Sequence, residues 1–164
     1  MAEPRELTSI LDALVAEGVE FVLVGALAAV AQGAPLTTHD VDIVHARTPQ
    51  NLDRLITALT KLNARYRGRP PGEVLRPNRG ALATAGHSLF MTDLGPLDCL
   101  GAIEGGQAYD DLVPMSVEVA LDARRLRVLD LERIVALKRT SKELKDRLAL
   151  PVLEETLRRR GQVR

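Results

Sequence analysis

The chain has 164 residues, enough for one domain with a sizeable core, and its content of 46% hydrophobic and 27% charged residues is ordinary for a soluble globular protein. Its formal net charge is zero, so no global field attracts nucleic acid or a membrane surface. Four aromatic residues and a single cysteine, Cys99, argue against an RNA reader that stacks bases on aromatic platforms and exclude an internal disulfide framework and a cysteine zinc cluster.

The N-terminal third begins with a predicted helix, because Leu7, Leu11 and Leu14 recur at helical spacing before Gly18. A short buried strand is expected at 21–24. Gly25 then opens a helix of small residues that runs from Ala26 to about Gln32 and is closed by Gly33. A strand that enters a helix through a glycine is a good phosphate site, because free N–H groups and the helix dipole face the anion.

The next strand, predicted over residues 38–44, carries two carboxylates, Asp40 and Asp42. Side chains alternate along a strand, so both carboxylates are expected on one face. Two like charges this close are unfavourable unless a cation lies between them. Magnesium prefers hard oxygen ligands, usually one or two carboxylates together with substrate phosphates. The spacing therefore predicts a metal–phosphate site.

The middle of the chain combines a helix, an arginine-rich segment and short strands. Thr48 and Pro49 predict the cap and first turn of a helix with an apolar leucine stripe. Residues 65–80 hold five arginines, three prolines, three glycines and one acid, which indicates an irregular loop or ragged hairpin. Further strands are expected at 81–84, 88–91, 97–100, 117–121 and 126–129.

The C-terminal part is predicted to be helical, with Asp130 capping one helix, Ser141 capping a second and Pro151 in the first turn of a third. The expected fold is α/β (α+β): a mixed, mostly antiparallel twisted sheet with helices mainly on one face. Residues 1–164 are expected to form a single domain with C-terminal helices at about 131–160.

Four segments, taken in order, resemble the nucleotidyltransferase superfamily related to DNA polymerase beta. The closer similarity is to the small stand-alone bacterial nucleotidyltransferases, including those of toxin–antitoxin modules. The similarity extends from about Val19 to Leu157. A single Asp-x-Asp motif on its own would be weak evidence for this family. The segments are Gly25-Ala26-Leu27-Ala28 with Gly33; Thr38-x-Asp40-x-Asp42; Thr92-x-x-Gly95-x-Leu97-Asp98; and Leu131 to Lys138 followed by Lys145-Asp146.

This resemblance implies a metal-dependent transfer of a nucleotidyl group from an NTP to an acceptor hydroxyl on RNA, a protein or a small molecule. Magnesium, or manganese in its place, would be the cofactor. Asp40 and Asp42 would bind the metal, and Asp98 would be the third metal-binding carboxylate and the general base. The implied nucleotide-binding residues are Gly25, Ala26, Thr38, Lys138, which would reach the triphosphate, and Asp146, which would orient a basic neighbour or the substrate.

Two departures from the family pattern leave alternatives open. Ala26 stands where the family has glycine or serine, and Leu36 stands where an arginine is often found. Both favour a second hypothesis, a catalytically weak or inactive nucleotide-binding partner in a two-protein, toxin–antitoxin-like module. A third hypothesis is an RNA-binding module that uses the arginine segment 65–80.

The expected compartment follows from two absences in the sequence. The longest apolar stretch, 21–31, is shorter than the roughly 20 residues that a bilayer requires. The first residues lack the pattern of a signal peptide. A cytoplasmic protein without a membrane partner is expected.

Overall fold

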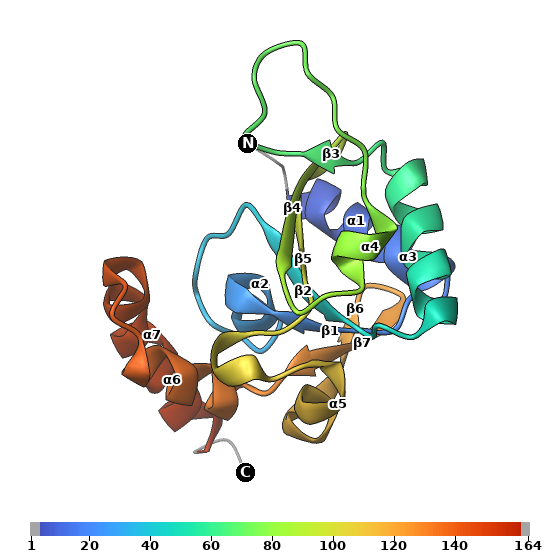
Figure 1. Cartoon of the computed structure of the whole chain (residues 1–164). Coiled ribbons are helices and arrows are strands. Elements are labelled where there is room, and N and C mark those ends of the chain that lie inside the picture. The colour runs from blue at the N-terminus through green and yellow to red at the C-terminus, as the bar shows by residue number, and fades with distance from the viewer. Residues whose placement is uncertain (1–3, 162–164) are drawn as a thin grey trace.

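One mixed sheet organises the protein in a computed structural model that describes residues 4–161 (Figure 1). The strands follow the order β3-β4-β5-β2-β1-β7-β6. Only β1–β7 and β2–β5 pair in parallel, and the other four described pairs are antiparallel, so the predicted mixed, mostly antiparallel sheet is confirmed. The strands are β1 (Phe21–Val24), β2 (Val41–His45), β3 (Arg65–Tyr66), β4 (His87–Thr92), β5 (Gly95–Leu100), β6 (Ser116–Leu121) and β7 (Arg124–Leu129).

Helices connect and cover these strands, and Figure 1 shows the last two packed together, well apart from α1 and α3. Within residues 4–161, none of the helices has both the length and the apolar character needed to cross a bilayer. The helices are α1 (Pro4–Ala16), α2 (Gly25–Val30), α3 (Pro49–Lys61), α4 (Arg79–Leu82), α5 (Tyr109–Leu112), α6 (Leu131–Thr140) and α7 (Leu144–Arg160), with short 3-10 turns η1 (Glu104–Gly106) and η2 (Val113–Met115).

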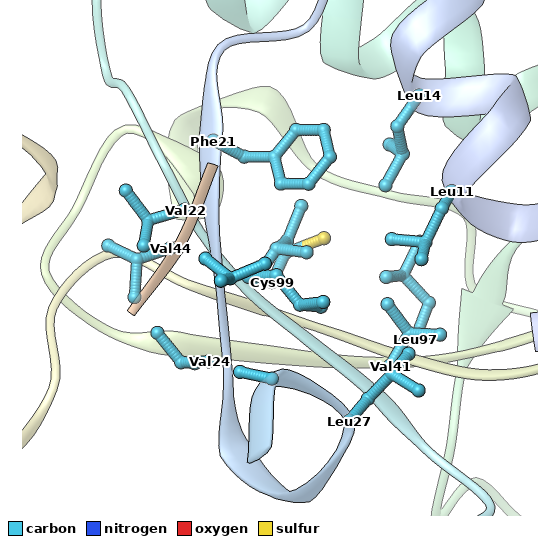
Figure 2. Packing of buried hydrophobic residues seen from close by; sticks show 14 of the residues in the cluster. Leu11, Leu14, Phe21, Val22, Val24, Leu27, Val41, Val44, Leu97 and Cys99 are labelled. Carbon is cyan, nitrogen blue, oxygen red and sulfur yellow. The ribbon is translucent and has the colours of Figure 1, made fainter. Parts of the chain in front are cut away.

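The core is aliphatic, as the scarcity of aromatic residues requires. Figure 2 shows Leu11 and Leu14 of α1 directed toward the sheet, where Leu97 and Cys99 of β5 are buried. Helix α1 also packs against α3, whose buried leucines form the predicted stripe. Burial of a leucine side chain stabilises the fold by roughly 2 kcal/mol. The packing of α1 and α3 therefore stabilises the sheet that carries the polar residues described below.

Local signals placed several elements correctly. Thr48 caps α3, with its hydroxyl accepting a hydrogen bond of 3.2 Å from the Asn51 N–H, and Pro49 occupies the first helical position. Strand β1 is fully buried, and Gly25 opens α2 directly after it. These features depend on neighbours in sequence, which is why sequence patterns were sufficient to predict them.

Two predicted elements are wrong. Residues 81–84 are not a strand, because α4 includes the first two of them and a turn and a bend follow. Asn78 caps that helix through a 2.9 Å hydrogen bond from the Ala81 N–H. The helices expected from Ser141 and from Pro151 are one continuous helix, α7, with Pro151 inside it. Pro151 is exposed, so water can solvate the carbonyl that the proline leaves without a donor.

Candidate functional site

Asp42 and Asp98 stand side by side on the sheet. Strands β2 and β5 are parallel neighbours, and their register pairs Asp42 directly with Asp98. Paired residues of adjacent strands project from the same face, about 5 Å apart. Both side chains are half-buried, and the two carboxyl groups are close enough to share a hydrogen bond. The fold therefore joins two acids that lie far apart in the sequence.

Asp40 does not share a strand with Asp42, contrary to the sequence prediction. Strand β2 begins at Val41, and Asp40 is an exposed residue in the irregular segment before it, where Thr38 Oγ1 lies 3.4 Å from the Asp40 N–H nitrogen. Its charge still raises the pKa of Asp42. Across residues 4–161, no three His, Cys, Asp or Glu side chains form a ready-made metal-ligating group.

Gly25 faces the Asp42 carboxylate at the start of α2. Register between β1 and β2 places Val24 opposite Asp42, so the following residue lies directly over its side chain. Gly25 has a φ of 72°, and a Cβ built there would lie 2.4 Å from Asp42 Oδ2. Both the positive φ and the contact demand glycine. This close approach brings the backbone N–H groups of a helix start next to the carboxylate pair.

The electrostatics of the pair favour a proton or a cation. Burial, then the hydrogen bond and charge of Asp98, and then the charge of Asp40 raise the pKa of Asp42 from 3.8 to about 7, although Lys145 opposes the shift. At neutral pH the site therefore holds more negative charge than its surroundings stabilise. A divalent cation would relieve that repulsion.

This shift predicts how stability depends on pH. A folded-state pKa above the unfolded value means that the folded protein binds the proton more tightly, so the stabilisation is present below about pH 4 and is lost as pH rises toward 7. The melting temperature of the wild type relative to Asp42→Asn should fall by roughly 4 °C between pH 5 and 7.5, measured by calorimetry without divalent ions. A difference that stays constant over this range would contradict the shifted pKa.

The residues present fit a divalent cation. Asp98 contributes one hard oxygen donor, from a side chain that is mostly buried. Asp42 contributes a second hard oxygen donor, and the Gly25 turn leaves room beside it that a side chain would fill. Two carboxylates completed by substrate phosphates are a usual donor set for magnesium.

The C-terminal helices form the opposite wall of a cavity of about 270 Å³ that Gly25 and Asp42 also line. Lys138 of α6 donates to Asp146 of α7 across a 2.7 Å ion pair, and Ser141 donates to the other oxygen of Asp146, also at 2.7 Å. Burial raises the pKa of Asp146, but the hydrogen bonds from Lys138 and Ser141 outweigh that effect and lower it. This ion pair is consistent with the predicted role of Asp146 in orienting a basic neighbour, which stays a prediction.

The structure shows where Ala26 and Leu36, the two residues that depart from the family pattern, lie. Ala26 is half-buried in the first turn of α2, where its backbone N–H is available irrespective of its side chain. Leu36 packs against the hydrophobic core. The arginine expected there is therefore replaced by a packing residue, and the cavity gains no cation from this position.

Sequence reasoning missed one residue of the site. Arg67 forms an ion pair with Asp98, with Nη2 2.6 Å from Oδ1, and this pair is mostly buried. Arg67 belongs to the segment proposed to bind RNA, whose other arginines also have partners within the protein. Arg69 pairs with Glu73, and Arg79 pairs with Asp53. No local signal marks Arg67, because its partner is on a strand distant in sequence.

No protein-family model and no curated protein matches the sequence. Several solved structures share the fold. The lincosamide antibiotic adenylyltransferase LnuA, bound to lincomycin, has a TM-score of 0.63 at 16% identity, over 94% of this chain and 98% of its own. A "putative nucleotidyltransferase" from Thermotoga maritima has a TM-score of 0.53 at 23% identity, over 100% and 97%. ANT(2")-Ia in complex with adenylyl-2"-tobramycin has a TM-score of 0.58 at 14% identity, over 93% and 90%. The predicted nucleotidyltransferase-like fold is confirmed.

Proposed function

We propose that this protein is a metal-dependent nucleotidyltransferase that moves a nucleotidyl group from an NTP to an acceptor hydroxyl. The observation that carries the proposal is the adjacent pair Asp42 and Asp98, in which Asp42 faces the Gly25 turn and lines a cavity walled by Lys138. An anion-binding helix start, two hard oxygen donors and an oriented cation together suit a nucleoside triphosphate. The shared fold of known adenylyltransferases supports this assignment.

In the proposed reaction, the acceptor oxygen bonds to the α-phosphorus while the bond to the bridging oxygen breaks and pyrophosphate leaves. Asp98 accepts the hydroxyl proton, and Asp42, with Asp40 nearby, would hold a divalent cation. A divalent cation at this position would neutralise the phosphate oxygens and the departing pyrophosphate. Thr38 and the amides of Gly25 and Ala26 bind phosphate oxygens. Positioning and charge stabilisation supply most of the catalysis in such transfers.

The similar structures and the lining of the cavity indicate which NTP donor and which class of acceptor come first. Leu100, Ile103 and Leu137 form an apolar wall on which a nucleobase would pack. Two of the similar structures are adenylyltransferases or hold an adenylyl product, and their named small molecules are antibiotics. We therefore place ATP first among donors and a small hydroxyl-bearing molecule first among acceptors, ahead of RNA or protein.

The test is a transfer assay with each α-³²P-labelled NTP, Mg²⁺ or Mn²⁺, and panels of small hydroxyl compounds, tRNA and protein. Expected is a labelled acceptor and equimolar pyrophosphate, with ATP preferred. Calorimetry of a non-hydrolysable ATP analogue measures binding independently of the acceptor. Absence of both binding and transfer would overturn the proposal. Binding without transfer to any acceptor would favour the inactive-partner hypothesis instead.

Lys138 supplies a prediction about nucleotide affinity. Because Asp146, which also accepts a hydrogen bond from Ser141, holds this ammonium at the cavity wall, Lys138→Met should raise the KM for the NTP by roughly tenfold with a smaller change in kcat. Lys142→Met removes the same charge from the exposed turn between α6 and α7 and should leave KM unchanged. Equal effects of both substitutions would show that only net charge matters, and would remove Lys138 from the site.

A further inference from the structure

Arg67 differs from the other arginines of the segment 65–80 in what it contacts. Arg65, Arg69 and Arg79 pair with Asp93, Glu73 and Asp53, acids whose side chains are at least 46% exposed. Arg76 donates to the side-chain oxygen of Asn63 at 2.7 Å. Arg67 instead pairs with Asp98, whose side chain is only 15% exposed. Poorly solvated pairs interact more strongly than exposed ones, because water screens them less.

Both the backbone and the guanidinium of Arg67 are held by contacts within the protein. Its backbone N–H donates to the Leu89 carbonyl at 2.9 Å, which extends the pairing with β4 beyond β3. Its Nη1 donates to the Phe90 carbonyl, while Nη2 contacts Asp98 Oδ1. The side chain therefore crosses β4 to reach β5. A cation held in this way keeps its position without further loss of side-chain freedom.

The strand order determines the direction from which each group approaches Asp98. Strand β5 lies between β4 and β2, so Arg67 reaches Asp98 from the β4 side while Asp42 lies on the β2 side. Asp98 Oδ1 is buried and lies 2.6 Å from Arg67 Nη2, while the same carboxyl group is within hydrogen-bond reach of Asp42. Asp98 thus lies between a fixed cation and the position that a metal would occupy.

We propose that Arg67 is a positioning residue that serves as the built-in counterion of Asp98, so that a divalent cation must compete with its guanidinium for this carboxylate. The role of Arg67 in catalysis rests on the proposed function, whereas its effect on cation binding does not. Arg67 orients the Asp98 carboxylate. It also lowers the affinity of Asp42 and Asp98 for a metal ion, because the positive guanidinium repels a cation bound to the same carboxylate.

The test measures Mn²⁺ binding by electron paramagnetic resonance titration without nucleotide. Arg67→Met should bind Mn²⁺ about tenfold more tightly than the wild type, because a neighbouring positive charge is gone. Arg67→Lys keeps the charge and should stay near the wild-type affinity. Arg69→Met removes an equal charge from the same segment, away from both carboxylates, and should also match the wild type. Circular dichroism confirms that each variant folds.

If Arg67→Met binds Mn²⁺ only as tightly as the wild type, or less tightly, the inference is overturned. Weaker binding is the result expected if Arg67 does no more than keep the local structure ordered. Absence of Mn²⁺ binding by all four proteins would overturn it as well. At saturating Mn²⁺, kcat of Arg67→Met should fall about tenfold with the KM for the NTP unchanged, and Arg67→Lys should recover part of it. If Mn²⁺ binding tightens but the wild type transfers no nucleotide, the proposed function fails and the counterion role remains.

Discussion

Asp42→Asn should reduce nucleotidyl transfer by about 1,000-fold or more while leaving the protein folded. The substitution keeps the size of the side chain and removes the charge on which the proposed metal depends. It also removes the charge whose burial, together with the hydrogen bond and charge of Asp98 and the charge of Asp40, raises the pKa of Asp42 to about 7. At pH 7.5 the variant should therefore melt at a higher temperature than the wild type. Loss of activity together with a gain in stability is the expected signature of a charged functional site.

The measurements for Asp42→Asn are kcat/KM in the transfer assay, Mn²⁺ affinity and the melting temperature. The matched control is Asp122→Asn, which changes the same net charge in the exposed turn between β6 and β7. Asp122 has a φ of 53°, a conformation that asparagine tolerates, so activity and stability should both be preserved. Transfer activity retained by Asp42→Asn would show that the carboxylate pair is not the catalytic centre.

Gly25→Ala should lower kcat/KM by about 100-fold or more, because catalysis depends on the carboxylate position to within about 1 Å. The added methyl carbon would lie 2.4 Å from Asp42 Oδ2, and the φ of 72° adds backbone strain. Asp42 must move to relieve the contact, which separates it from Asp98 and displaces the amides at the start of α2. Mn²⁺ affinity should fall in parallel.

Gly33→Ala is the matched control for Gly25→Ala. Gly33 also has a positive φ, 99°, but a Cβ there meets nothing within 4 Å. It should therefore cost about 1 kcal/mol of stability from strain, seen in urea unfolding, and leave kcat/KM unchanged. If both variants lose activity equally, strain alone explains the effect, and the contact with Asp42 has no role.

The pairing of the arginines bears on the RNA-binding hypothesis. Arg67 and Arg69, two arginines of the segment 65–80 that the hypothesis uses, both form ion pairs within the protein. A phosphate backbone would have to displace Asp98 and Glu73 to bind them, which reduces the gain from each contact. The structure favours a role for Arg67 inside the site over a role in RNA binding.

The sequence by itself determined the elements whose signals are local. A buried apolar run followed by Gly25 gave β1 and α2, Thr48 and Pro49 gave the start of α3, and alternating residues gave β2 with Asp42. Each depends on side-chain period, a cap or a glycine turn, which neighbouring residues decide. The resemblance of four ordered segments also predicted the fold, and it pointed to Asp98.

Only the tertiary structure decided which side chains meet. The register of β2 against β5 brings Asp98 to Asp42, and the crossing of β4 brings Arg67 to Asp98. The structure also shows Asp40 outside the strand and α7 continuous through Pro151. Register between distant strands is set by burial of whole faces of the sheet, and long-range ion pairs follow from that register, so no local pattern specifies them.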